Sequence, residues 1–248
     1  MLRGVYSSAS GMMAGAHSQR VISDNVSNVN TNGHRAGRAV MSPFGAMFLK
    51  RTDSETHSGA SPIGSTNAGA RVSERYTNEA PGEIRHTGRE GDLALEGSGY
   101  FVLEGQEGPL LSRDGEFMVD DDGYLVSAEG YRLRSDVGFI HVGDNSFDVD
   151  SDGTVNVNGD SVGQLEIAQP DTDQTELLEG GYVQLDDAAL EPAEDTLVHQ
   201  GQLESSNVDM VKELTLLMTA QRSYAANHTA MQVQDETLDE ATRLSDGI

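Results

Sequence analysis

The residues most capable of chemistry are the aspartates of segment 148–153, which reads Asp-x-Asp-x-Asp-Gly. Alternate carboxylates followed by a sharp glycine turn open a calcium-binding loop. Such a loop closes with a carboxylate at its twelfth position, which is Gly159 here, and no helix pattern flanks the segment. An aspartate–glycine pair between short apolar runs is also a strong hairpin signal. We therefore expect a solvated hairpin turn at 148–153, with a calcium site as the alternative.

The three adjacent aspartates at 120–122 have the same explanation. Neighbouring side chains on a strand cannot all point one way, and Gly123 completes a second aspartate–glycine pair. We expect a turn here as well.

Sequence evidence for a catalytic site is weak throughout the chain. A hydrolase needs an acid and a base with shifted pKa values in one pocket, but 41 Asp and Glu residues make chance pairs common. Cysteine is absent, and there is no G-x-S-x-G elbow, P-loop or dinucleotide-binding turn. The histidines lack the short spacing of metal ligands; they are His17, His34, His57, His86, His141, His199 and His228. We predict a protein that is not an enzyme and uses no cofactor or metal.

The charge is distributed unevenly along the chain, whose net charge is -25. Residues 1–50 carry a net charge of +4, residues 91–200 carry -23, and residues 201–248 carry -5. Opposite charges at the two ends favour their pairing. The acidic middle excludes nucleic acid as a partner, because phosphates need a basic surface. It indicates a solvated outer face, with a saline habitat as the alternative explanation.

The sequence predicts no membrane insertion. No apolar run approaches the ~20 residues that a spanning helix needs. The first ten residues contain no continuous apolar segment, so we expect no cleaved secretory signal.

Residues 2–29 are expected to form the first helix. Apolar residues recur there every three or four positions, and no proline interrupts them. Most of these residues are Ala, Met and Val, so a helix of this length needs a partner. Asparagine and glycine residues at 28–33 favour a turn at its end.

Residues 208–246 are expected to form the last helix, because they contain no glycine or proline. Residues 205–207 offer N-caps, and Asp209 is expected in the first turn, where the helix dipole favours an acid. A spacing of 3.5 residues joins Met210, Leu214, Leu217, Tyr224, Met231 and Leu238, with polar Gln221, His228 and Asp235 in the same series. We expect the two helices to pack together; the alternative is that each covers a face of the central domain.

Between the helices, short apolar runs alternate with turns. Asp-Gly or Asn-Gly pairs, which favour hairpins, occur at 114–115, 122–123, 152–153 and 158–159. The predicted fold class is therefore α+β. Long N- and C-terminal helices pair as a coiled-coil-like inner domain, and a mostly antiparallel β outer domain is inserted between them.

Four domain ranges follow from these patterns. They are 1–50 for the N-terminal helix and turn of the inner domain, 51–71 for an extended connector, 72–200 for the β-rich outer domain, and 201–248 for the C-terminal helix of the inner domain. The connector is inferred from its Ser, Thr, Gly and Ala content.

Several segments, taken in order, resemble the flagellar basal-body rod and hook family of bacteria. They are 6–12 (YSSASGM), 24–33 (DNVSNVNTNG), 91–101 (GDLALEGSGYF), 112–117 (SRDGEF), 205–211 (SSNVDMV) and 220–227 (AQRSYAAN). The resemblance implies a structural subunit of the basal-body rod that polymerises head to tail into the helical axial drive shaft for flagellum-dependent motility. It also implies copies of itself and other rod and hook subunits as partners. Export would run through the flagellar type III apparatus.

The resemblance and the helix patterns together predict an assembly interface in the two terminal segments. Its predicted residues are Leu2, Val5, Met12, Ile22, Asn25, Asn28, Asn30, Thr31, Gly33, Asn207, Val208, Leu214, Leu217, Gln221, Arg222, Tyr224, Asn227, Met231 and Leu238. Because neither terminal segment buries much apolar area alone, we expect both to be poorly ordered in the exported monomer and to fold on assembly.

Two departures refine the resemblance. After Gly33 the family usually has an aromatic residue and a lysine, whereas this chain has His34 and Arg35. The connector after residues 47–49 is also short, which favours the proximal-rod-type member or its Gram-positive rod relative.

Two other classes of function are the alternatives. One is an extracellular calcium-binding β module, and the other is a peptidoglycan-cleaving enzyme attached to the rod.

Overall fold

A computed structural model of the chain describes residues 2–43, 46–51, 61–67, 69–105, 108–143, 145–170, 176–177, 182–184, 190–193 and 196–246. The chain divides into two compact units. The helical unit comprises Met1–Ser27, Gly37–Asn78 and Asp209–Ile248, and the β unit comprises Asn28–Ala36 and Glu79–Val208.

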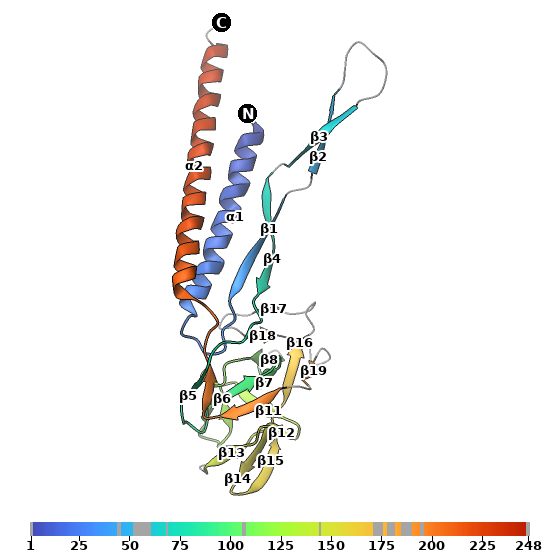
Figure 1. The fold of residues 1–248 in the computed structure, drawn as a ribbon, viewed down its shortest axis with the longest axis vertical. Coiled ribbons are helices and arrows are strands. Elements are labelled where there is room, and N and C mark those ends of the chain that lie inside the picture. Colours follow the sequence, from blue (N-terminus) through green and yellow to red (C-terminus); the bar gives the residue numbers. More distant parts are fainter. Residues whose placement is uncertain are drawn as a thin grey trace. The chain divides into compact units, whose positions relative to one another are not determined.

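Two long helices lie side by side in the helical unit (Figure 1). They are α1 (Leu2–Ser27) and α2 (Met210–Asp246). The N-terminal and C-terminal helices thus pack together, as the α+β prediction required. Each helix is two residues shorter than expected, at the C-terminal end of α1 and the N-terminal end of α2.

The N-cap of α2 is Asp209. Its Oδ1 accepts hydrogen bonds from the backbone N–H groups of Val211, at 3.0 Å, and Lys212, at 3.1 Å. Its carbonyl accepts the first helical bond, from Glu213 N–H at 2.9 Å. The expectation that a residue of 205–207 caps this helix is therefore wrong, because the carboxylate of Asp209 satisfies the free N–H groups.

Two antiparallel strand pairs complete the helical unit. β1 (Gly37–Pro43) pairs with β4 (Ala70–Thr77), and β2 (Ala46–Arg51) pairs with β3 (Ser61–Asn67). The sequence patterns did not predict these pairs, in which β3 and the start of β4 occupy part of the expected connector. The four expected domain ranges stay a prediction.

The β unit is built from antiparallel pairs among its described residues, which confirms the predicted β architecture. Its largest sheet runs in the order β17-β18-β8-β7-β11-β10-β9, with β12, β16 and β19 attached. These strands are β7 (Tyr100–Glu104), β8 (Pro109–Ser112), β9 (Met118–Val119), β10 (Leu125–Val126), β11 (Arg132–Ser135), β12 (Gly138–Phe139), β16 (Ile167–Pro170), β17 (Glu176–Leu177), β18 (Val183–Gln184) and β19 (Leu190–Pro192).

Smaller sheets surround this one in the β unit. Three strands run in the order β13 (Phe147–Val149), β14 (Thr154–Val157) and β15 (Asp160–Gln164). Two pairs join β6 (Leu93–Glu96) to β20 (Leu197–Gln200), and β5 (Ile84–His86) to β21 (Gln202–Glu204).

Three of the four predicted hairpins are confirmed. The turn at 122–123 joins β9 to β10, the turn at 152–153 joins β13 to β14, and the turn at 158–159 joins β14 to β15. The hairpin expected at 114–115 is wrong. There the chain runs against β6, and the Gly115 carbonyl accepts a hydrogen bond from Leu93 N–H at 2.9 Å.

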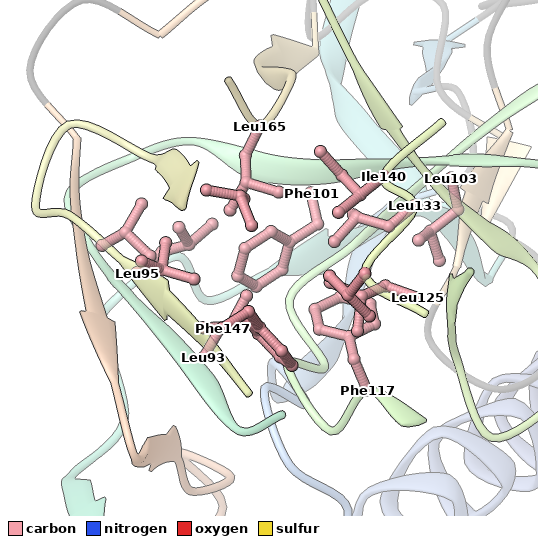
Figure 2. Packing of buried hydrophobic residues seen from close by; sticks show 14 of the residues in the cluster. Leu93, Leu95, Phe101, Leu103, Phe117, Leu125, Leu133, Ile140, Phe147 and Leu165 are labelled. Atoms are coloured by element: carbon pink, nitrogen blue, oxygen red, sulfur yellow. The ribbon is translucent and has the colours of Figure 1, made fainter. Parts of the chain in front are cut away.

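The core of the β unit is a cluster of aliphatic side chains around Phe101, Phe117 and Phe147 (Figure 2). The rings of Phe101 and Phe117 meet edge to face, with their centroids 5.2 Å apart, an arrangement that aromatic pairs favour. On β7, Phe101 and Leu103 enter this cluster, while Val102 between them enters a second one with Leu111. Because successive strand side chains point to opposite faces, β7 is buried on both sides.

Candidate assembly interface

One row of α2 is less exposed than the rest of the helix. Its members are spaced alternately by four and three residues, the spacing of a coiled-coil contact. The buried or half-buried members are Glu213, Leu217, Ala220, Asn227, Met231, Gln234, Leu238 and Ala241. Tyr224 completes the spacing but is 39% exposed, and its Cβ lies 3.7 Å from the position of an added Cβ at Gly15. Four of the six predicted apolar residues belong to this row, but Met210 and Leu214 do not.

The partner row on α1 is made of small residues. An added Cβ at Gly4 would lie 2.6 Å from the side chain of Gln234, and one at Gly11 would lie 2.8 Å from that of Asn227. Fourteen residues beyond Gly11, Asn25 contacts Glu213. Steps of seven along α1 thus match steps of seven back along α2, so the helices are antiparallel in a fixed register.

Asn25 joins three elements of the helical unit. It is 1% exposed. Its Nδ2 donates to the Gly37 carbonyl at 2.9 Å and to Glu213 Oε2 at 3.2 Å, and its Oδ1 accepts from Gly37 N–H at 2.9 Å. A buried polar group is stable only with such partners. Asn25 therefore fixes the end of α1 against β1 and α2.

Asn207 organises a second polar junction, within the β unit. Its backbone N–H donates to the His34 carbonyl at 3.2 Å, and its Oδ1 accepts from Ala36 N–H at 2.8 Å. Its Nδ2 donates to the Ala80 carbonyl at 2.6 Å. Beside it, Gly33 N–H donates to the Glu204 carbonyl at 2.7 Å. The segments 28–36 and 204–208, far apart in sequence, are thus held together by backbone and amide contacts.

A buried ionic cluster lies next to this junction. Glu204 binds Arg35 Nη2 at 3.1 Å and Arg113 Nη1 at 3.2 Å, and all three side chains are at most 7% exposed. Burial lowers the pKa of Arg113, and the positive charge of Arg35 lowers it further, while Glu204 and Tyr100 oppose the shift. The Arg113 guanidinium lies over the Tyr100 ring, 5.1 Å from its centroid.

Large apolar side chains remain exposed on other faces of both helices. On α1, Tyr6 is 70% and Met13 75% exposed, and they are seven residues apart. On α2, apart from Tyr224, the exposed large apolar residues are Met210, Val211, Leu214, Leu216, Met218, Val233 and Leu244. Met210, Leu214 and Met218 follow one another at steps of four residues and so share one face of α2. Apolar side chains gathered on an exposed face mark a contact with another molecule.

The structure places the predicted interface residues in three groups. The first lies in the helix pair and comprises Val5, Met12, Ile22, Asn25, Leu217, Tyr224, Asn227, Met231 and Leu238. The second lies at or beside the β-unit junction and comprises Asn28, Thr31, Gly33, Asn207 and Val208. The third is exposed and comprises Asn30, Leu214, Gln221 and Arg222. The side chain of Leu2 lies outside the described residues.

Sequence reasoning missed the residues that set the helix register. Gly4, Gly11 and Glu213 carry no apolar signal, so a search for hydrophobic periodicity passes over them. The seven-residue spacing of Gly4, Gly11 and Ser18 with Asn25 was the signal that could have found them.

Membrane-spanning helices and clustered metal ligands are both absent from the part of the chain that the structure describes. No described helix there is long and apolar enough to cross a membrane. No group of three or more acidic or histidine side chains there is arranged to hold a metal ion. Asp150 and Asp152 lie in the hairpin turn between β13 and β14, and Asp148 lies within β13, opposite Asn156.

Three sequence models of protein families match successive parts of the chain. Residues 5–35 match "Flagella basal body rod protein", residues 94–157 match "Flagellar hook protein FlgE/F/G D1 domain", and residues 199–244 match "Flagellar basal body rod FlgEFG protein C-terminal". The first and third cover most of the helix pair, and the second covers much of the β-unit core.

Similar proteins carry related names. The flagellar basal-body rod protein FlgG of Bacillus subtilis is 31% identical over 273 aligned residues, which cover 98% of this chain and 99% of the relative. FlgF of Caulobacter vibrioides is 30% identical over 82% of each chain. The hook-basal body complex protein FlhO of Bacillus subtilis is 27% identical over 97% of each. The chain belongs to the flagellar basal-body rod protein family.

Proposed function

We propose that this chain is a structural subunit of the flagellar basal-body rod, which polymerises head to tail into the helical axial drive shaft. The observation that carries the proposal is the helix pair with its uncovered apolar side chains, among them Tyr6, Met13 and Met218. A subunit whose contacts use two different faces builds an open helical filament unless its rotation closes a ring. The relatives are named for the basal-body rod, which supports the basal body as the location.

The role proposed is structural and not enzymatic. The relatives are named for a place in an assembly rather than for a reaction. The long helices of the helical unit are suited to packing against other helices. We propose copies of this chain and other rod and hook subunits as partners.

Mass spectrometry of purified hook–basal bodies, stripped stepwise from the outer end, tests this function. We expect the chain in the rod fraction, below the hook. Its depth in the series also tests the predicted proximal-rod level. Recovery only from soluble or cell-wall fractions would contradict a rod subunit.

The export route is a separate proposal. We propose that the chain passes through the flagellar type III export apparatus, as the family resemblance implies. Disabling that apparatus should retain the chain inside the cell, whereas disabling the general secretory route should not. Continued export without the type III apparatus would contradict the proposal.

A further inference from the structure

Charge is divided unequally between the two units of the chain. The strands β1 to β4 of the helical unit contain five basic residues and one acidic residue. The β unit contains 30 acidic and six basic residues. A basic surface of the helical unit in one copy is therefore complementary in charge to the β unit of a neighbouring copy.

The β1–β4 pair presents one exposed face. Arg38 lies opposite Tyr76 in the register, and Val40 follows two residues later on the same side of β1. Val40 is 43% and Tyr76 58% exposed, and Arg38 is exposed as well. Ser42 continues this side, and its Oγ accepts a hydrogen bond from Arg71 Nε at 3.4 Å. We call these five residues the outer strand face.

The outer strand face combines positive charge with exposed apolar side chains. α1 packs against β1 and β4, yet these side chains stay exposed. Neither Arg38 nor Arg71 forms an ion pair with a residue that the structure describes. The register sets one acid, Glu74, opposite Val40, but β1 and β4 together still contain three basic residues. Exposed apolar side chains among unpaired charges of one sign mark a contact surface.

A surface of the opposite sign lies at one edge of the largest sheet. β9 is the last strand in the order of that sheet and pairs with β10. Its residues Met118 and Val119 are 45% and 42% exposed. Of the three aspartates at 120–122 that follow, Arg132 Nη2 binds the first at 3.5 Å and the third at 3.0 Å. Asp121 is exposed and has no ion pair in the described part of the chain. Three carboxylates thus share one guanidinium, and we call Met118, Val119 and these aspartates the β9 edge.

We propose that the outer strand face of one copy docks on the β9 edge of a neighbouring copy of this chain. Each surface offers two exposed large apolar side chains, which gain free energy by leaving water. Their opposite charges select which surfaces meet and exclude contacts between like surfaces. The inference rests on the proposed rod function, which supplies the neighbouring copy.

Exchanging the charges of the two surfaces tests the docking in rods. Arg38→Glu and Asp121→Arg, made singly, should each lower incorporation at least about tenfold, because like charges would face each other across the contact. The double variant should recover most of this loss, since the charge pair is restored with its signs exchanged. Both side chains are exposed, so each variant should keep the melting temperature of the unaltered chain. Normal incorporation of either single variant would overturn the proposal.

Asp148→Arg is the matched control for this exchange. Asp148 is also exposed in the β unit, and its carboxylate has no ion pair among the described residues. Asp148→Arg changes the net charge as much as Asp121→Arg does, but it should not rescue Arg38→Glu. Equal rescue by the two variants would show a response to net charge alone and would overturn the pairing of these surfaces.

Cysteine cross-linking reads out the contact directly, because the chain contains no cysteine of its own. One chain with Val40→Cys and another with Val119→Cys are expressed together, and their rods are treated with a mild oxidant. Each chain then has a single cysteine, so a disulfide joins two copies. We expect dimers of unlike chains. Replacing the second chain by one with Val137→Cys should give none, since Val137 is 71% exposed but lies outside the β9 edge. Absence of the unlike dimer with Val119→Cys would overturn the docking.

Failure of the docking is distinguishable from failure of the rod function. If the unaltered chain is present in rods and the exchanged charges do not restore incorporation, the docking alone is overturned. If the unaltered chain is absent from rods, the rod function fails and the docking fails with it.

Discussion

Gly33 lies at a position where backbone geometry and packing both exclude a side chain. Its φ is +66°, and an added Cβ would lie 2.3 Å from the backbone carbon and oxygen of Arg113. Gly130 also has a positive φ, of +87°, but nothing lies within 4 Å of its Cβ position. Comparing substitutions at Gly33 and Gly130 therefore separates the strain of a positive φ from the effect of crowding by neighbouring atoms.

We expect Gly33→Ala to lower the free energy of unfolding by at least about 3 kcal/mol, because the backbone of Arg113 must move. Gly130→Ala should cost about 1 kcal/mol, the conformational strain alone. Urea unfolding followed by circular dichroism measures both. Equal losses for the two variants would contradict the predicted clash at Gly33.

Asp114 makes the stability of the β unit depend on pH. The pKa of Asp114 is raised to about 6, chiefly by burial and also by nearby carboxylates including Glu116 and Glu129, while the hydrogen bond from Glu116 N–H opposes the shift. The folded state therefore binds the proton more tightly than the unfolded state. This stabilisation is complete below about pH 4, the pKa of the unfolded chain, and is lost as pH rises through about 6.

We expect Asp114→Asn to remove this dependence. The variant should exceed the unaltered protein in stability at pH 7 by on the order of 1–2 kcal/mol, because it has no carboxylate to bury. The difference should shrink toward pH 4. Urea unfolding at pH 4, 5, 6 and 7 measures it, with the exposed Asp121→Asn as the control for one lost negative charge. A constant difference across this range would contradict the assignment.

At the scale of the element, Leu217 tests the helix pair. It lies half-buried in the α2 row, whereas Thr219, two residues away, is exposed. Leu217→Asp should cost about 1–3 kcal/mol and abolish incorporation into rods, because a charge would enter the contact between the helices. Thr219→Asp should assemble normally. Hydrogen exchange of the β-unit core amides should stay slow in both variants, and a Leu217→Asp chain that still builds a rod would contradict the role of the pair.

The two helices were predictable, but their contact row was only half predictable. The seven-residue series of Leu217, Tyr224, Met231 and Leu238 was apolar and was assigned to the contact. The other half of the row lies outside that apolar series, and of its members only Asn227 was predicted at the interface, through the family resemblance. These residues approach α1 because glycines there leave room for them, which only the structure of both helices shows.

In the remainder of the chain, turn residues predicted most of the hairpins between neighbouring strands. They did not predict the pairing of strands that are far apart in sequence. The turns at 122–123, 152–153 and 158–159 join strands that are adjacent in sequence. The residues that signal each turn are therefore the residues that form it. β1 and β4 are separated by the residues between Pro43 and Ala70, and no turn pattern indicates their pairing. At 114–115 the glycine of the aspartate–glycine pair lets the backbone pass close to β6 instead of turning. The dipeptide alone does not show which of these two roles it has.

At the scale of the whole molecule, we expect the helices to depend on contacts beyond the single chain. Most of α2 is exposed, while ordering its 37 residues costs about 1–2 kcal/mol per residue in backbone entropy. We expect circular dichroism of the dilute monomer to show less helix than α1 and α2 contain, and assembly to raise it. The β-unit amides should be protected from hydrogen exchange in both states. Full helicity in a dilute monomer would contradict this expectation.

The matched spacing of α1 and α2 has a mechanical consequence. A rod transmits torque, so paired helices within each subunit are pulled along one another. The register resists such sliding, because a slip of one heptad would separate the Glu213 carboxylate from Asn25. The contact between Asn25 and Glu213 therefore opposes a shift of register when the rod carries load.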